Sequence, residues 1–207
     1  REIGAEMIEN PRCRKITFTG STEVGRELMR AGAPYIKKLS LELGGHAPVL
    51  VFADGDLDAA VQGTIIAKFR NTGQSCIAAN RIYVQREVHD EFVEKFTAAA
   101  RALKVGDGFT EGVEIGPLID ETGLNLALEH IDQAVAAGAT VQCGGRRWSG
   151  ANGEGGQGFF LEPTVLTGVP ADARCMREET FAPVAPVVSF TDEAEAVALA
   201  NDTEYGL

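Results

Sequence analysis

Segments with the pattern of strands alternate with segments of helical periodicity through most of this chain, and that order restricts the folds open to it. Strands are expected over residues 48–52, 81–84, 140–143, 159–166 and 183–190. Helices are expected over residues 56–71, 88–103, 121–138 and 192–201, the last capped by Thr191. Alternation of this kind predicts an α/β fold.

The first part of the chain has its own strand and helix pattern. Residues 15–19 are expected as a strand that turns at Gly20-Ser21 into a helix, and residues 38–43 as a second strand. Alternation in that second strand places its leucines on one face and Glu42 on the other. Glu42 is therefore a candidate for a pocket.

Composition narrows the functional classes. The chain has 207 residues, 44% of them hydrophobic, and a formal net charge of -11. Nucleic acids and anionic membranes need clustered Lys and Arg, so neither is an expected partner. There is no apolar run of transmembrane length and no signal peptide pattern at residues 1–4, so the expected setting is reducing and cytoplasmic.

The four cysteines show no C-x-x-C pairing and the three histidines are scattered, so no metal site and no disulfide framework is expected. Cys143 follows an apolar stretch and is interpreted as a core residue. Cys13 and Cys175 lie in polar segments and are interpreted as peripheral.

Cys76 has a different setting, because it follows a short polar turn with the sequence Asn-Thr-Gly-Gln-Ser after a predicted helix. A thiolate nucleophile needs an exposed turn with backbone N–H groups nearby, and Gly73 lets another backbone or a ligand approach closely. Glu42, followed by Gly44-Gly45, offers a carboxylate as base. This pair suggests covalent catalysis.

The turn Gly20-Ser-Thr-Glu-Val-Gly25 joins a strand to a helix and could present N–H groups to a phosphate. It departs from the G-x-G-x-x-G fingerprint, and alone it is equally typical of a helix cap.

Taken in order, several strings resemble the aldehyde dehydrogenase superfamily, and residues 70–81 are most like its succinate-semialdehyde dehydrogenase branch. The strings are FTGSTEVG at 18–25, LELGG at 41–45, GQSC at 73–76, GPL at 116–118, EETFAP at 178–183 and NDTEYGL at 201–207.

The resemblance implies a three-layer α/β catalytic domain over 44–207, incomplete at its C-terminus, preceded over 1–43 by the tail of a Rossmann-like dinucleotide-binding domain. Full-length members are roughly double this size, so the chain is expected to be a fragment, inactive alone, of a homo-oligomeric enzyme. Its first part is expected to pack against another chain or to be unusually mobile.

The resemblance also implies roles for individual residues. Cys76 would attack the aldehyde carbon, with its backbone N–H helping to hold the oxyanion, and Glu42 would be the general base. The cofactor would be NAD or NADP, with no choice between them from these residues. The residues implied to contact it are Gly20, Ser21, Gly25, Leu43, Glu179 and Phe181. The family's usual glycine before Pro183 is Ala182 here.

Arg70 indicates the substrate class. Near a helix end an arginine can simply interact favourably with the helix dipole. In the succinate-semialdehyde branch the matching arginine binds the distal carboxylate, and a guanidinium suits that task. The expected substrate is thus a small anionic semialdehyde, succinate semialdehyde first.

Two alternatives stay open. One is a cysteine hydrolase or acyltransferase in which His46 activates Cys76 without any nicotinamide. The other is a non-catalytic structural fragment. Arg81, which begins a predicted strand, is interpreted as structural.

Overall fold

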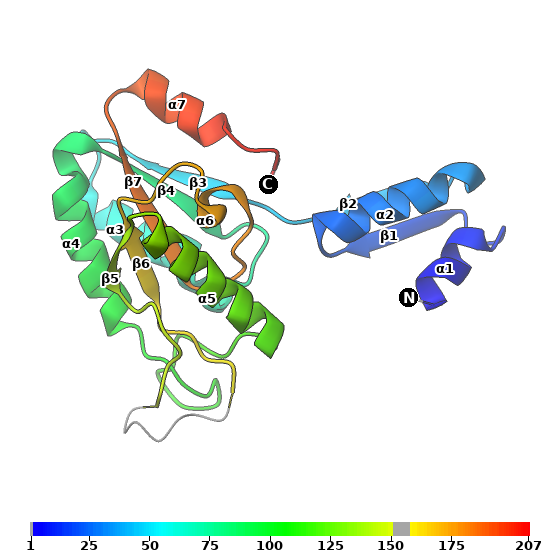
Figure 1. Ribbon diagram of the computed structural model, residues 1–207, viewed down its shortest axis with the longest axis horizontal. Coiled ribbons are helices and arrows are strands. Elements are labelled where there is room, and N and C mark those ends of the chain that lie inside the picture. Colours follow the sequence, from blue (N-terminus) through cyan, green and yellow to red (C-terminus); the bar gives the residue numbers. More distant parts are fainter. Residues whose placement is uncertain (1, 151–157) are drawn as a thin grey trace. The chain divides into compact units, whose positions relative to one another are not determined.

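A computed structural model describes residues 2–150 and 158–207, and the chain divides into two compact units, Arg1–Gly44 and Gly45–Leu207 (Figure 1). Residues 151–157, within the glycine-rich stretch 144–158 that the sequence predicts to be a loop, lie outside the described residues. The two units are described separately.

The first unit is a small parallel α/β element. Strands β1 and β2 pair in parallel, with Lys15 opposite Lys38 and Thr19 opposite Glu42, and a helical crossover joins them, as parallel pairing requires. Apolar side chains of this unit remain open: Met29 is 58% exposed and Ile36 is 89% exposed. Its elements are α1 Glu2–Glu9, β1 Lys15–Thr19, α2 Thr22–Gly32, η1 Ala33–Tyr35 and β2 Lys38–Glu42.

The second unit is built on a five-stranded sheet in the order β3-β4-β7-β6-β5, in which only the β5–β6 pair is antiparallel. The predicted α/β class is confirmed. The strands are β3 Ala47–Val51, β4 Ala79–Gln85, β5 Thr140–Cys143, β6 Thr164–Thr167 and β7 Val184–Phe190. The helical elements are α3 Leu57–Phe69, η2 Arg70–Gly73, α4 Arg86–Ala102, α5 Glu121–Ala136, α6 Arg174–Arg177 and α7 Glu193–Asn201.

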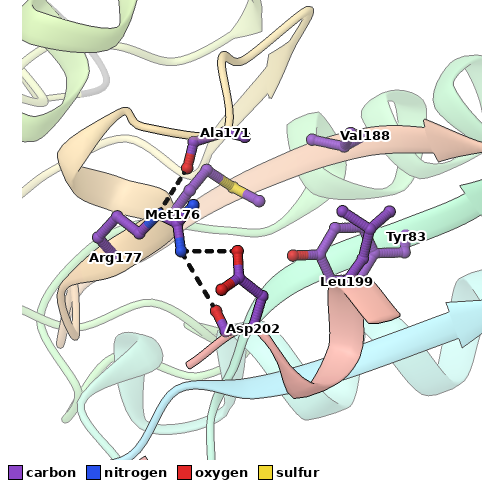
Figure 2. Close-up of a pocket in the computed structure, with 7 residues that line it drawn as sticks. All are labelled: Tyr83, Ala171, Met176, Arg177, Val188, Leu199 and Asp202. Carbon is purple, nitrogen blue, oxygen red and sulfur yellow. Dashed lines mark hydrogen bonds and ion pairs between the residues drawn. The ribbon is translucent and has the colours of Figure 1, made fainter. Parts of the chain in front are cut away.

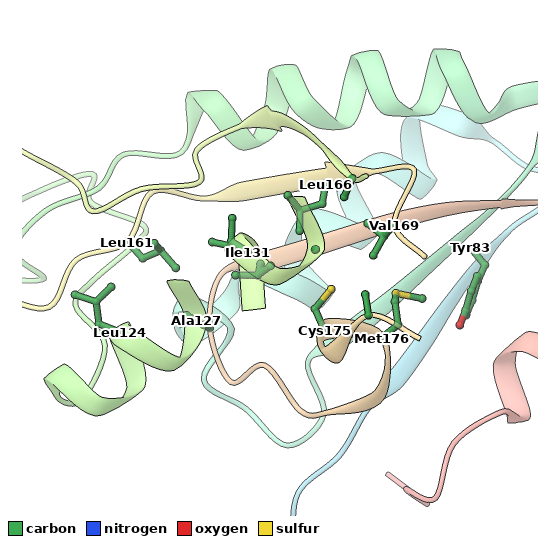
Figure 3. Packing of buried hydrophobic residues seen from close by; sticks show 14 of the residues in the cluster. Tyr83, Leu124, Ala127, Ile131, Leu161, Leu166, Val169, Cys175 and Met176 are labelled. Atoms are coloured by element: carbon green, nitrogen blue, oxygen red, sulfur yellow. The ribbon is translucent and has the colours of Figure 1, made fainter. Parts of the chain in front are cut away.

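Helices cover both faces of this sheet, so alternate residues of each central strand enter different cores. Ile82 and Val84 of β4 pack with the phenylalanines of α3 and α4, whereas Tyr83 faces the core formed with α5 and α6. Figure 3 shows the second core, in which Leu124 and Ile131 of α5 lie with residues of β6 and α6. This gives three layers.

Two local predictions were wrong. The cap of the last helix is Asp192, not Thr191, because the Asp192 carboxylate accepts the Glu195 N–H at 2.9 Å. Cys175 is fully buried, not peripheral: the single turn of α6 directs Cys175 and Met176 into the core while its arginines face outward.

Among residues 2–150 and 158–207, no helix has both the length and the apolarity to cross a bilayer. That same part of the chain contains no cluster of His, Cys, Asp and Glu that could hold a metal ion.

Candidate active site

The turn before Cys76 has an unusual backbone. Asn71, Thr72 and Gly73 follow one another in the left-handed region, with φ of 54°, 61° and 73°. Such a conformation is unfavourable for a β-branched residue such as Thr72 and persists only where surrounding contacts hold it. The hold comes from Gly116, whose N–H donates to the Thr72 hydroxyl at 3.1 Å.

The loop Gly116-Pro117-Leu118 therefore supports this turn. The Gln74 side chain donates to the Pro117 carbonyl at 3.2 Å and accepts the Ile119 N–H at 3.0 Å. The Gly116-Pro117-Leu118 loop, to which no role was assigned from the sequence, thus fixes the shape of the segment that carries Cys76. The cysteine itself is half-buried.

Two glycines allow the loops at this place to meet backbone to backbone. A Cβ atom at Gly45 would lie 1.9 Å from the Cys76 carbonyl oxygen, and one at Gly73 would lie 2.3 Å from the Ala182 carbonyl oxygen. Neither side chain could fit without moving a backbone. The segments that carry Gly45, Cys76 and Ala182, far apart in the sequence, are consequently in direct contact.

The Glu179 side chain contacts the Gly45 segment described above. Its half-buried carboxylate accepts the Gly45 N–H at 3.0 Å. Burial raises the pKa of Glu179, while the Gly45 N–H and the Lys68 ammonium oppose that shift. Two residues on, Phe181 has a φ of 45° and a ring that remains 45% exposed. Ala182 is fully buried in the core, so its methyl group packs there.

Lys68 is fully buried, and it was not recognised from the sequence as part of this site. Its ammonium donates to the Asn80 side-chain oxygen at 2.7 Å and to the Thr180 hydroxyl at 3.2 Å. The signal was its spacing from Val61 and Thr64, which puts all three on the buried side of α3. Burial lowers the pKa of Lys68 to about 7.

Replacing Lys68 with methionine is expected to flatten the pH dependence of stability. The folded pKa is depressed, so between about pH 7 and pH 10 the unfolded chain binds a proton that the folded chain does not, and the free energy of unfolding rises with pH. Urea denaturation at both ends of this window should show a rise on the order of a few kcal/mol in the natural chain. The control Lys95→Met, at a partly exposed lysine, should keep the rise, and a Lys68→Met chain that keeps it too would contradict the assignment.

Arg81 ties the end of the chain to the same region. Its buried guanidinium donates to the His46 carbonyl at 2.9 Å and to the carbonyls of Leu199 and Ala200, both at 3.0 Å, which end α7. Arg81 is thus structural, as the sequence indicated. Beyond α7, the Leu207 carbonyl accepts the His46 N–H at 2.8 Å.

A second arginine anchors the chain just beyond α7. Figure 2 shows Arg177 donating to the Ala171 carbonyl and to Asp202, at 2.8 and 2.7 Å. The cavity drawn there, also lined by Tyr83, Met176 and Leu199, measures only about 30 Å³. Since none of the predicted catalytic residues lines it, it is a packing gap under α7 and not the candidate site.

His46 does not take the role that the hydrolase alternative gave it. The ring is fully buried, 5.7 Å between centroids from the Tyr205 ring. Burial lowers the pKa of His46 to about 4, and no hydrogen bond joins it to Cys76 within the described residues. A nucleophile and its base must be within hydrogen-bond reach, so the structure gives that alternative no support.

In the first unit, the predicted residues gather at the carboxyl ends of β1 and β2. The Gly20 N–H donates to the Glu42 carbonyl at 3.0 Å, and the exposed Glu42 side chain ends β2. Ligands of open parallel sheets bind at this edge. Ser21 caps α2 by accepting the Val24 N–H at 3.3 Å.

Gly25 has a packing role in the same unit. A Cβ atom there would lie 2.7 Å from a Leu43 methyl, so the missing side chain lets Leu43 pack on α2. Contact of Gly25 and Leu43 with a dinucleotide stays a prediction.

Arg70 lies at the C-terminal end of α3, six residues before the cysteine, with an exposed side chain. It forms no ion pair with any of the residues that the structure describes. Its guanidinium is therefore unpaired within the described part of the chain, and its role in binding a substrate carboxylate stays a prediction.

Comparison with known proteins decides the family. Residues 1–207 match the family model described as "Aldehyde dehydrogenase family". The chain belongs to the aldehyde dehydrogenase family.

Among its aldehyde dehydrogenase relatives is the succinate-semialdehyde dehydrogenase [NADP(+)] of Escherichia coli, 53% identical over 99% of this chain and 41% of the relative. The glutarate-semialdehyde dehydrogenase of Pseudomonas aeruginosa is also 53% identical, over 100% of this chain and 41% of its own length. A crystal structure of succinate-semialdehyde dehydrogenase from Burkholderia pseudomallei superposes with a TM-score of 0.92 at 52% identity, covering 99% of this chain and 41% of that one. The chain thus spans about two fifths of these aldehyde dehydrogenases.

Proposed function

We propose that this chain supplies the nucleophile and the general base of an NAD(P)-dependent dehydrogenase that oxidises a small anionic semialdehyde, succinate semialdehyde first. The supporting observation is that Gly45, which meets the Cys76 backbone and donates to the Glu179 carboxylate, brings together three strings that are far apart in the sequence. Family membership gives the reaction class.

In this proposal the Cys76 thiol gives its proton to Glu42, which passes it to solvent, and the sulfur bonds to the aldehyde carbon while the carbonyl oxygen becomes an oxyanion held by nearby backbone N–H groups. Loss of hydride from that carbon leaves a thioester on Cys76. Water then attacks the thioester carbon while Glu42 removes a proton from the water, and the C–S bond breaks to release the carboxylate and the thiol.

The residues present suit a dinucleotide. Glu179 uses one carboxylate oxygen for the Gly45 N–H, and its second oxygen makes no hydrogen bond to the described residues, which leaves it able to accept from ribose hydroxyls. The exposed Phe181 ring offers an apolar surface beside it. When bound, the cofactor supplies the hydride acceptor. The name of the Escherichia coli relative favours NADP.

The substrate proposal depends on Arg70. The substrates named for the two relatives are both semialdehydes with a distal carboxylate. The unpaired, exposed guanidinium of Arg70 can bind such a group in a bidentate manner.

Replacing Arg70 with leucine should lower kcat/KM for succinate semialdehyde about 100-fold and leave oxidation of the neutral butyraldehyde within about threefold, because only the charged substrate loses its partner. The assay follows absorbance of the reduced nicotinamide, in a polypeptide of the relatives' length that contains this chain. Arg86→Leu, at an exposed arginine on α4, is the matched control. Equal losses on both aldehydes would exclude a role for Arg70 in carboxylate recognition.

The same assay tests the reaction class. Formation of reduced cofactor with succinate semialdehyde supports the proposal, whereas thioester hydrolysis without nucleotide would favour a hydrolase. The 207-residue chain alone is expected to be silent in both assays, and the homo-oligomeric state remains a prediction for the longer protein.

A further inference from the structure

Buried hydrogen bonds form a closed ring around the base of Glu179. Lys68 donates to Asn80 and Thr180, the Asn80 amide donates to the Gly45 carbonyl at 3.3 Å, and the Gly45 N–H donates to the Glu179 carboxylate. Thr180 adjoins Glu179 in the sequence and also donates to the Asn80 oxygen at 2.9 Å, which closes the ring. Lys68 is the only charged group in it besides Glu179 itself.

We propose that Lys68 is a positioning residue that fixes the Glu179 carboxylate for cofactor binding, acting through Asn80 and Gly45 on one side and through Thr180 on the other. The proposal rests on the proposed function in one respect, that Glu179 contacts the cofactor. Lys68 itself is sealed from solvent.

Burial makes this arrangement rigid. Lys68, Asn80 and Thr180 are each at most 2% exposed, so water cannot replace a partner that is lost. Removing the ammonium leaves the Asn80 side-chain oxygen and the Thr180 hydroxyl each with one hydrogen-bond partner fewer in an interior without water. Buried polar groups that lose a partner rearrange to form other hydrogen bonds. Asn80 is then released from the orientation in which it holds Gly45.

The charge of Lys68 acts on Glu179 as well. The titratable groups that face Lys68 are Cys175 of α6, Glu179 and, from the Gly45–His46 segment, His46. Because the lysine opposes the rise that burial causes in the pKa of Glu179, its loss should raise that pKa further. An ionised Glu179 is the better acceptor, so cofactor affinity should fall when the pH is lowered and Glu179 becomes protonated. In a Lys68→Met variant this fall should begin at a higher pH than in the natural protein.

The first test needs no catalysis. Amide hydrogen exchange of Gly45 is measured in the natural chain and in the Lys68→Met variant. The Gly45 amide is expected to exchange about tenfold faster in the variant, because that factor corresponds to the loss of roughly one hydrogen bond to a charged group. Thr180→Val should change it in the same direction. Thr180→Ser, which keeps the hydroxyl, and the surface variant Lys95→Met should match the natural chain.

The second test uses the polypeptide of the relatives' length. Lys68→Met should raise the KM for the dinucleotide about tenfold and shift the pH dependence of that KM to higher pH. The KM for the aldehyde and the alkylation rate of Cys76 should be unchanged. An unchanged Gly45 exchange rate in Lys68→Met overturns the positioning role. If Lys68→Met does not fold, the Thr180→Val and Thr180→Ser pair decides by the same criterion. Absence of dehydrogenase activity in the natural polypeptide would instead refute the proposed function and leave the exchange result to stand.

Discussion

Replacing Cys76 with serine is expected to lower the rate of aldehyde oxidation by about four orders of magnitude or more. A serine hydroxyl is far less acidic than a thiol and is a much weaker nucleophile in the same turn, and the His46 ring, buried against Tyr205, forms no hydrogen bond to position 76 that could activate it. The change removes one sulfur and leaves the left-handed turn, its bond to Gly116 and the Gly45 contact in place. The loss should therefore appear in kcat without loss of the fold.

The measurement is the initial rate of reduced nicotinamide formation in the polypeptide of the relatives' length, with thermal unfolding followed in parallel. Cys13→Ser is the matched control, because Cys13 is also half-buried but belongs to the first unit, where its thiol donates to the Lys15 carbonyl. Mass spectrometry of acid-quenched enzyme should find an acyl group on the Cys76 peptide of the natural protein. More than about one hundredth of the natural rate in Cys76→Ser would exclude Cys76 as the nucleophile.

The sequence predicted most elements because their signals are local. Alternation gave β1 and β2 nearly residue for residue, and helical spacing gave α5 to within a turn. The cap of α7 was misplaced by one residue because Thr191 and Asp192 are both good N-cap types, and only the geometry of the Asp192 carboxylate distinguishes them.

The candidate site residues could be proposed from the sequence, but the contacts that hold them in place could not. Cys76 and Glu179 are recognised from strings of neighbouring residues, whereas the contact of Gly45 with Cys76 depends on how distant loops cross. Lys68 was missed because a charged residue is normally placed on the solvent side of a helix, and its partners Asn80 and Thr180 lie on other elements. Cys175 was misassigned because its arginine neighbours suggested a surface.

Replacing Gly45 with alanine should destabilise the second unit by on the order of 3 kcal/mol, because the new methyl would lie 1.9 Å from the Cys76 carbonyl oxygen and 2.9 Å from that of Leu207. These are backbone atoms, and they cannot rotate away as a flexible side chain would. Urea denaturation reports the loss through the fluorescence of Trp148, the single tryptophan of the sequence, which packs on Phe160 in this unit.

Gly63→Ala is the control for glycine replacement itself. A methyl at Gly63, inside α3, meets no atom within 4 Å, so alanine should stabilise the helix by about 0.5–1 kcal/mol. The two substitutions add the same methyl group and should act in opposite directions. Because the Gly45 N–H also holds Glu179, the alanine variant should lose cofactor binding together with stability, whereas a Gly45→Ala chain as stable as the natural one would mean that the backbones of Gly45 and Cys76 do not meet.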